Sequence, residues 1–181
     1  MQTTAEWVRE NSHGPVTADD EQLNAAGRRP GSSVYRHLEG ARRIIIHHSA
    51  TETGCARVFR SLHRAVNGWV DIGYHFVIGN GSLSRDGDVE EGRPAWAVGA
   101  HARHNNEDSI GVCLVGDMNL HPPTEEQLRS LGRLMATLMA RHGLGPEDLY
   151  LHGDLPGCST ECPGSHLTLE LVRGLLEGDG E

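Results

Sequence analysis

The sequence predicts an α/β fold in which a central mixed β-sheet is flanked by helices. Short runs of apolar and β-branched residues alternate along the chain with longer segments of helical periodicity. The run at residues 44–46 consists of three isoleucines, which is typical of a strand buried on both faces. The stretch at residues 71–83 contains a Gly-Asn-Gly turn that predicts a hairpin. Together these patterns favour one α/β domain whose sheet is covered on its faces.

The first predicted elements follow a polar extension. Residues 1–40 contain the turn-rich stretches "HGPVTADD" and "GRRPGSS", with a short helix indicated only at "AEWVRE". We therefore expect an N-terminal extension over residues 1–40 and a domain over residues 41–181. The first strand is "RRIIIHHSAT", and a helix is predicted over residues 55–66. The apolar face of that helix comprises Val58, Leu62, Ala65 and Val66.

The later elements continue the alternation. "SIGVCLVGD" predicts a third central strand, and "PTEEQLRSLGRLMATLMARHG" predicts the clearest helix. Thr124 and Gln127 form a capping box at its start, and Gly143 ends it. "DLYLHGD" predicts a short strand ending at His152, and "LTLELVRGLLE" predicts a closing helix. The apolar stripe of the clearest helix comprises Leu128, Leu131, Met135, Leu138 and Met139.

Charge and composition exclude several classes of partner. The formal net charge is −9, and nucleic-acid binding depends on basic residues that neutralise phosphates, so no nucleic-acid partner is expected. All 16 basic residues are arginine, so no catalytic lysine is available. No apolar run approaches the roughly 18 residues of a membrane span, and the start lacks the features of a secretory signal. We therefore expect no membrane insertion, and synthesis in the cytoplasm without a signal peptide. We also expect a monomer.

Three residues with metal-ligating side chains follow apolar runs. His47 follows "RRIII", His152 follows "LYL", and Cys162 lies in the next loop. Strand ends in α/β sheets are where functional groups collect. Two neutral imidazoles and one thiolate suit Zn²⁺ and leave a fourth position for water. This pattern indicates hydrolysis of an amide without a protein nucleophile.

Spacing alone leaves other interpretations open. A histidine that ends a strand is often only hydrogen-bonded. His152, Cys158, Cys162 and His166 could close a structural zinc knot. A disulfide between Cys158 and Cys162 would close a very short loop in a chain without a secretory signal. Cys55 completes, with Cys113, the set of four cysteines, and both are expected to be small buried apolar residues.

Five segments stand in order between residues 43 and about 176: "IIIHHSAT", "GWVDIGYHFVIGNG", "VEEGRPAWAVGAHARHNNEDSIGVCLVGD", "PTEEQ" and "LYLHGDLPGCSTECPG". In this order and spacing the chain resembles the zinc-dependent N-acetylmuramoyl-L-alanine amidases of type 2. That family includes phage lysozymes that are amidases, and the peptidoglycan recognition proteins. The resemblance implies the single-domain fold of this family, with zinc at the floor of a groove.

The resemblance also implies roles for individual residues. It implies that His47, His152 and Cys162 are the zinc ligands, although the family's "GHRD" block reads "HGD" here. Tyr74 matches a tyrosine beside the reacting water. Thr160 stands where phage members hold lysine, and it would stabilise the developing oxyanion.

Substrate contacts are implied more loosely. His101 in "GAHA" lies where family members line the groove, and Trp69 and Trp96 would offer flat rings to sugars. His48 faces the substrate or, like His75 and His101, helps to protonate the leaving amine. Packing inside the fold is the alternative for each. The loop from His152 to Cys162 is two residues longer than in many relatives, and it adds Cys158, which could compete for the metal.

The implied function is hydrolysis of the amide between N-acetylmuramic acid and L-alanine by zinc-activated water. The partners would be peptidoglycan or muropeptide fragments, reached in the wall through a holin or a secretion system. A non-catalytic peptidoglycan sensor is one alternative, although members that only bind typically lack the cysteine ligand. A cytosolic recycling amidase that acts on soluble anhydro-muropeptides is another.

Overall fold

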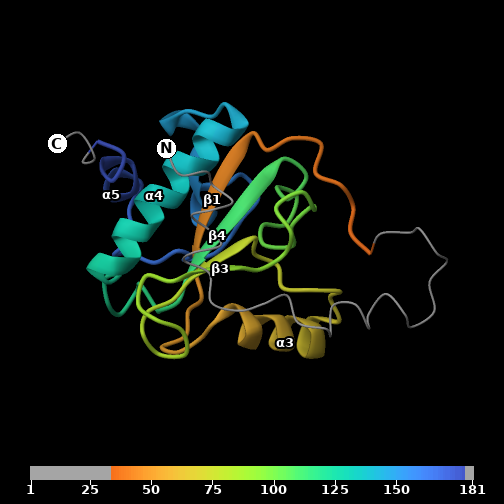
Figure 1. The fold of residues 1–181 in the computed structure, drawn as a ribbon, viewed down its shortest axis with the longest axis horizontal. Coiled ribbons are helices and arrows are strands. Elements are labelled where there is room, and N and C mark those ends of the chain that lie inside the picture. Colours follow the sequence, from red (N-terminus) through yellow and green to blue (C-terminus); the bar gives the residue numbers. More distant parts are fainter. Residues whose placement is uncertain (1–33, 178–181) are drawn as a thin grey trace.

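The domain is built on a five-stranded sheet in a computed structural model, of which we describe residues 34–177. The strand order is β3-β2-β4-β1-β5, and β1 lies parallel to both β4 and β5 (Figure 1). β2 is parallel to β4 and antiparallel to β3, which confirms the mixed sheet and the predicted hairpin. The strands are β1 (Arg43–His48), β2 (Phe76–Ile78), β3 (Val89–Glu91), β4 (Ser109–Leu114) and β5 (Leu149–Leu151).

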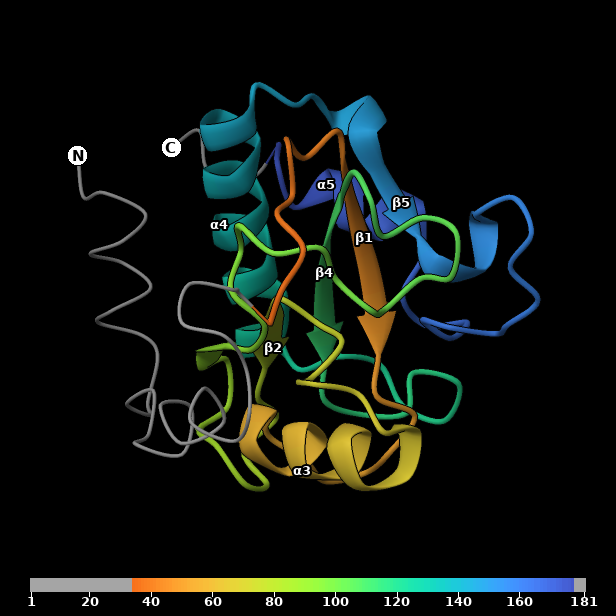
Figure 2. The same ribbon diagram turned by 90° about the vertical axis from the view of Figure 1, so that its right-hand side faces the viewer.

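Helices cover both faces of this sheet. α3 (Ala56–Asn67) lies on one side, while α4 (Glu125–His142) and α5 (Leu169–Gly174) lie on the other (Figures 1 and 2). Two single-turn 3₁₀ helices, Pro146–Asp148 and His152–Asp154, flank β5. Within residues 34–177, no helix combines the length and the apolar character needed to cross a membrane.

The helix α4 begins and ends where its sequence predicts. The Thr124 hydroxyl accepts a hydrogen bond from the backbone N–H of Gln127, whose side-chain oxygen accepts one from the backbone N–H of Thr124. Gly143 adopts the left-handed conformation, with φ of 68°, and donates its N–H to the carbonyl of Met139. The predicted stripe packs on the sheet, so local capping and periodicity were sufficient to place this helix.

The predicted apolar face of α3 is wrong. Leu62 and Val66 are 49% and 71% exposed, whereas Ala56 and Phe59 are buried against the sheet. The inward face also carries Arg60, whose guanidinium donates to the Asp71 carboxylate at 2.6 Å. A partly buried ion pair and one aromatic ring therefore fix the rotation of this helix.

Alternation along β1 sends successive side chains to opposite faces of the sheet. Ile44 and Ile46 point into the larger core, which α4 and α5 cover. Ile45 and His47 point to the opposite side. His48, the next residue, therefore faces away from His47. This single step in the strand decides which of the two adjacent histidines reaches the site.

The end of the expected N-terminal extension packs on the domain. His37 forms an isolated antiparallel bridge with Ala97, and Leu38 is buried in the larger core. The Leu38 backbone N–H donates to the Trp96 carbonyl at 2.7 Å. The short helix expected at "AEWVRE" lies outside the described residues.

Candidate metal centre

Strand register brings the two histidines together. Ile46 of β1 pairs with Leu151 of the parallel strand β5, so the residues that follow them, His47 and His152, emerge side by side. Their ring centroids are 4.5 Å apart. Because both strands end at the same edge of the sheet, strand pairing alone fixes this pair, without any contribution from the loops.

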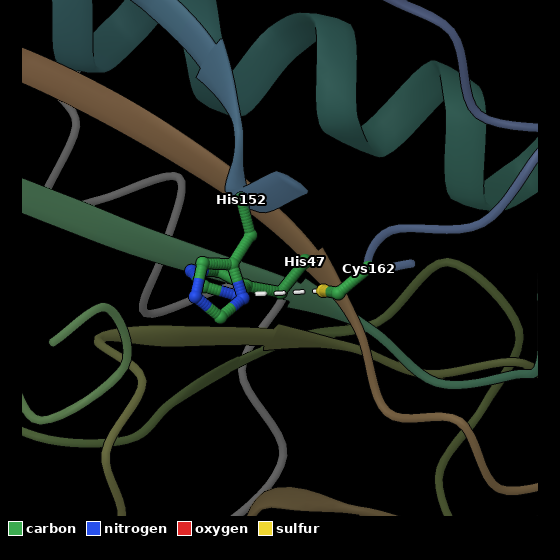
Figure 3. Close-up of side chains that lie close together, drawn as sticks. All are labelled: His47, His152 and Cys162. Atoms are coloured by element: carbon green, nitrogen blue, oxygen red, sulfur yellow. Dashed lines mark hydrogen bonds between the residues drawn. The ribbon is translucent and has the colours of Figure 1, made fainter. Parts of the chain in front are cut away.

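A tight loop closure brings Cys162 to the same point. The backbone N–H of Gly153 donates to the Cys162 carbonyl at 2.7 Å. A Cβ atom at position 153 would lie 2.9 Å from the carbonyl oxygens of both Thr160 and Cys162, closer than real Cβ contacts allow. The Cys162 sulfur then lies 3.7 Å from His47 Nδ1 (Figure 3). Glycine after His152 is therefore a requirement of this loop.

The three side chains form one cluster of potential ligands. One ligand atom from each of His47, His152 and Cys162 lies within 4.8 Å of the others, and over residues 34–177 the cluster has three members. In a tetrahedral zinc site, N–Zn bonds near 2.0–2.1 Å and S–Zn bonds near 2.3 Å place ligand atoms about 3.3–3.6 Å apart. The Cys162 sulfur and His47 Nδ1, 3.7 Å apart, are already close to this spacing, and the whole set lies within 4.8 Å, so the residue types and their grouping fit a zinc ion.

Burial sets the protonation of these ligands. It lowers the pKa of His47 well below its usual value, and the neighbouring His152 lowers that pKa further. Burial also lowers the pKa of His152. Both rings are thus neutral near pH 7, with lone pairs available for a metal. Burial raises the pKa of Cys162 to about 12, and the nearby Cys158 adds to this rise. A metal must therefore displace a proton from the Cys162 thiol.

The second ring nitrogen of His47 contacts His101. The His47 Nε2 and His101 Nδ1 atoms are 3.0 Å apart, and the two rings meet edge to face. We expected His101 to line the substrate groove. His101 is instead buried, at 8% exposure, and its side chain packs against the His47 ring.

Tyr74 lies beside the cluster. Its ring centroid is 5.2 Å from that of His47. Burial raises the pKa of Tyr74 well above its usual value, and Cys113 and Cys162 raise it further. The phenol is therefore protonated at neutral pH and has a proton to donate in a hydrogen bond.

Thr160 contacts the ligand loop from within. Its Oγ1 accepts a hydrogen bond from the backbone N–H of Cys162 at 3.2 Å, and the residue is exposed. A hydroxyl that accepts this bond retains its own proton for donation. The role that we expect for Thr160 at the oxyanion stays a prediction.

The expected proton-relay histidines are committed to backbone contacts. His48 Nδ1 accepts from the Met118 backbone N–H at 3.0 Å. His75 Nδ1 accepts from the Gly111 N–H at 2.9 Å, while its Nε2 lies 2.9 Å from the Ala97 carbonyl. Burial lowers the pKa of His75 to about 4. Both histidines therefore have clear structural partners, and His75 uses both of its ring nitrogens.

The two tryptophans expected at the groove lie in different surroundings. Trp69 is 38% exposed and packs on His63, whose ring also contacts Tyr74. Trp96 packs against Tyr35 and against the ring of His37. Trp69 is thus connected to the cluster through His63 and Tyr74. The ring contacts of Trp96 are with residues that precede β1.

The alternative cysteine arrangements are not formed. All four cysteines are free. Cys158 packs against the small core that contains Ile45, with its sulfur 3.9 Å from Asn105 Nδ2, and it does not join the ligand cluster. His166 Nδ1 lies 2.8 Å from the Met118 carbonyl oxygen. The structural knot and the short disulfide are therefore both wrong as descriptions of this site.

Sequence reasoning missed His63. This residue lies on the inward face of α3, where its Nδ1 accepts from the Gly73 backbone N–H at 3.1 Å. Its ring lies between Trp69 and Tyr74. Had the inward face of α3 been predicted correctly, His63 would have been expected to face the site.

A mixed α/β sheet with a buried and a half-buried imidazole at its strand ends, joined by a thiol from the following loop, defines a candidate metal-dependent hydrolase. Comparison with known families is more specific. Residues 38–165 match the family model for N-acetylmuramoyl-L-alanine amidase. This chain therefore belongs to the N-acetylmuramoyl-L-alanine amidase family.

Individual relatives agree with this assignment. The endolysin of Escherichia phage T7 is 40% identical over 119 residues, which is 60% of this chain and 73% of the phage protein. The solved structure of the N-acetylmuramoyl-L-alanine amidase LysC from Clostridium intestinale URNW superposes with a TM-score of 0.72 and 29% identity, covering 83% of this chain and 95% of LysC.

Peptidoglycan recognition proteins share the fold as well. A structure of tracheal cytotoxin bound to the ectodomain complex of peptidoglycan recognition proteins LCa and LCx matches with a TM-score of 0.65 and 32% identity. The match covers 78% of this chain and 87% of that one. Relatives with this fold therefore include proteins named as hydrolases and proteins named for recognition.

Proposed function

We propose that this protein is a peptidoglycan hydrolase that cleaves the amide between N-acetylmuramic acid and the L-alanine of the stem peptide. Family membership and the amidase and endolysin relatives support this reaction. The observation that carries the proposal is the meeting of His47, His152 and Cys162 at one point. Three ligands from distant segments are typical of a catalytic zinc site.

We infer that zinc is the cofactor, with His47, His152 and Cys162 as its ligands. Bound zinc supplies Lewis acidity, which polarises a carbonyl and acidifies water. The neutral imidazoles and the soft sulfur suit this ion better than Mg²⁺ or Ca²⁺, which prefer oxygen ligands. Burial lowers the pKa of both histidine ligands, so protons do not compete with the metal for their imidazole nitrogens near pH 7.

Tyr74 and Thr160 would act on the substrate rather than on the protein. The protonated phenol of Tyr74 would donate a hydrogen bond to the attacking water or to the scissile group, which orients it. The Thr160 hydroxyl would donate to the carbonyl oxygen as negative charge develops there. Trp69, exposed beside the cluster, offers a flat apolar face for a sugar ring.

The substrate would be cell-wall peptidoglycan or its muropeptide fragments. The cytotoxin complex of the recognition proteins and the endolysin relatives support this choice. We further propose that the protein acts as a monomer at the wall. His48 and Trp96 are kept as candidate substrate contacts, although their described partners belong to the fold.

The reaction is tested by chemical analysis of digested walls. Purified sacculi are treated with the native protein and with Cys162→Ser, and the new amino termini and the new reducing sugar ends are both labelled. We expect new N-terminal alanine without new reducing ends, and only from the native protein. New reducing ends would indicate a glycosidase and contradict the proposal.

The same preparations separate the alternative functions. A protein that binds zinc and sacculi but frees no alanine terminus would be a sensor. Release from soluble anhydro-muropeptides, with none from intact sacculi, would indicate a recycling amidase. Either result would replace the wall-hydrolase assignment.

A further inference from the structure

We propose that His101 is a positioning residue for His47: it holds the His47 ring by one nitrogen, so that the other, Nδ1, presents its lone pair to the metal. This inference rests on the proposed zinc site. It assigns to His101 a role beneath the ligand set rather than on the substrate groove. The evidence is the seat built for the His101 ring and the direction of the hydrogen bonds that leave it.

The His101 ring lies in a space that two glycines create. A Cβ atom at Gly111, in the central strand β4, would lie 2.5 Å from His101 Cδ2. A Cβ atom at Gly99 would lie at the same distance from that atom. Any side chain at either position would displace the ring. The sheet and the loop before His101 therefore both leave room for this imidazole.

The backbone beneath the ring is fixed as well. The side-chain oxygen of Asn106 accepts hydrogen bonds from the backbone N–H groups of His101 and Ala102, at 2.8 and 3.0 Å. Ala102 is buried in the same small core as Ile45, which points to the same side of β1 as His47. The base of the side chain is thus held while the two glycines confine its ring.

The direction of these hydrogen bonds follows from the backbone carbonyl at which the series ends. The Asn105 carbonyl can only accept, and Ser109 Oγ lies 2.5 Å from it, so the single hydroxyl proton of Ser109 points there. Ser109 Oγ, 3.5 Å from His101 Nε2, can then only accept from that nitrogen. A neutral His101 with its proton on Nε2 has an acceptor at Nδ1.

The acceptor at His101 Nδ1 decides which tautomer His47 adopts. His47 Nε2 lies 3.0 Å from His101 Nδ1 and must carry the proton of this bond. The remaining nitrogen, Nδ1, then has a free lone pair, and it is the atom that lies 3.7 Å from the Cys162 sulfur. The alternative tautomer would place a proton where the metal must bind. Outer hydrogen-bond partners of metal-bound histidines typically change metal affinity about 10–100-fold.

The native chain provides the first test, without any variant. Long-range proton–nitrogen correlation spectra of ring-labelled protein, recorded without metal at pH 7, distinguish the two tautomers of each neutral histidine. We expect the Nε2–H form for His47 and for His101. A His47 ring with its proton on Nδ1 would overturn the proposal, whatever the behaviour of any substituted chain.

Two substitutions at position 101 provide the second test. His101→Phe fills the seat without an acceptor, whereas His101→Asn places an amide oxygen near the former Nδ1 position. Zinc affinity is measured by competition with a chromophoric chelator, and urea unfolding of the metal-free proteins reports the fold. We expect zinc binding to weaken about 10–100-fold in the phenylalanine variant and to stay within about fivefold of native in the asparagine variant.

The outcomes separate positioning from packing. Equal zinc affinity for His101→Phe and native protein, with both folded, would overturn the proposal. Equal weakening in both variants, in proportion to lost stability, would assign His101 a packing role and would also overturn it. No cell wall enters these measurements, so absence of hydrolysis by the native protein would contradict only the proposed function.

Discussion

The two adjacent histidines of β1 illustrate what single residues contribute. Strand alternation sends His47 to the α3 side of the sheet and His48 to the opposite core, where its ring accepts from the Met118 backbone. The pattern "IIIHH" predicts that only one of them reaches the site, but it does not say which face carries the metal. The family resemblance chose His47, and the fold brings that residue to His152 and Cys162.

Cys162→Ser tests the sulfur ligand at this scale. A hydroxyl oxygen is a poorer ligand for zinc than a thiolate, so we expect zinc to dissociate at least about 100-fold more readily and wall hydrolysis to be lost. Chelator competition and release of alanine termini measure the two effects. The matched control is Cys158→Ser, because Cys158 lies outside the cluster. Loss of zinc from the control with retention in Cys162→Ser would reverse the assignment.

Proton release on zinc binding tests the protonation of the ligands. The Cys162 thiol, with a pKa of about 12, must lose its proton to bind zinc, whereas burial keeps both imidazoles neutral. We expect about one proton released per zinc at pH 6.5. Calorimetric titrations in buffers of different ionisation enthalpy give this number. Release of two or more protons would mean that the imidazoles are charged before zinc binds.

At the scale of elements, local signals were strong where capping and periodicity decide the structure. The capping box of α4, its glycine stop and the β2–β3 hairpin were all predictable. The face of α3 was not, because Arg60 turns inward to pair with Asp71, a residue in the loop that follows the helix. An apolar count along the helix favoured Leu62 and Val66, which are exposed. Tertiary pairing of one charged residue overrode the helical pattern.

The loop that carries Cys162 shows the same limit. Its spacing suggested Cys158 as a rival ligand, and only the closure from Gly153 to Cys162 shows which sulfur turns toward the histidines. The hydrogen-bond partners of His101 were also beyond prediction from the sequence. They depend on two glycines and a serine that periodicity does not distinguish from ordinary sheet residues.

Gly153→Ala tests this loop as a unit. The added methyl group would meet two carbonyl oxygens at 2.9 Å, so the Cys162 segment must shift. We expect about a tenfold loss of zinc affinity, because ligand geometry outside the ion's preferred range weakens binding. Gly157→Ala, in the same loop, serves as the comparison for substitution itself, since its Cβ meets nothing within 4 Å, although its φ of +80° adds strain. Unchanged zinc affinity in Gly153→Ala would contradict the role assigned to the closure.

At the scale of the whole molecule, the fold buries neutral histidines and should be sensitive to acid. The folded pKa of His75 is about 4, below its value near 6.5 in an unfolded chain, so unfolding takes up a proton between these pH values. Stability is therefore complete above pH 6.5 and falls as the pH drops toward 4. The loss from His75 alone is about 3 kcal/mol over that range. Burial of His47 and His101 acts in the same direction.

Urea unfolding of the metal-free protein at pH 7.0 and 4.5 measures this loss. His75→Gln keeps a donor near the Nε2 position but does not titrate, so its free energy of unfolding should fall less on acidification than that of the native protein. Parallel losses in both proteins would show that His75 is not a source of the acid sensitivity.

The central claim is that folding gathers two imidazoles and one thiolate around a single zinc ion. Zinc X-ray absorption spectroscopy of the loaded native protein tests it most directly. The claim predicts one sulfur near 2.3 Å and two imidazole nitrogens near 2.0–2.1 Å, completed by a light atom. A spectrum with two sulfurs would bring Cys158 into the site, and one with no sulfur would exclude Cys162; either result would contradict the account.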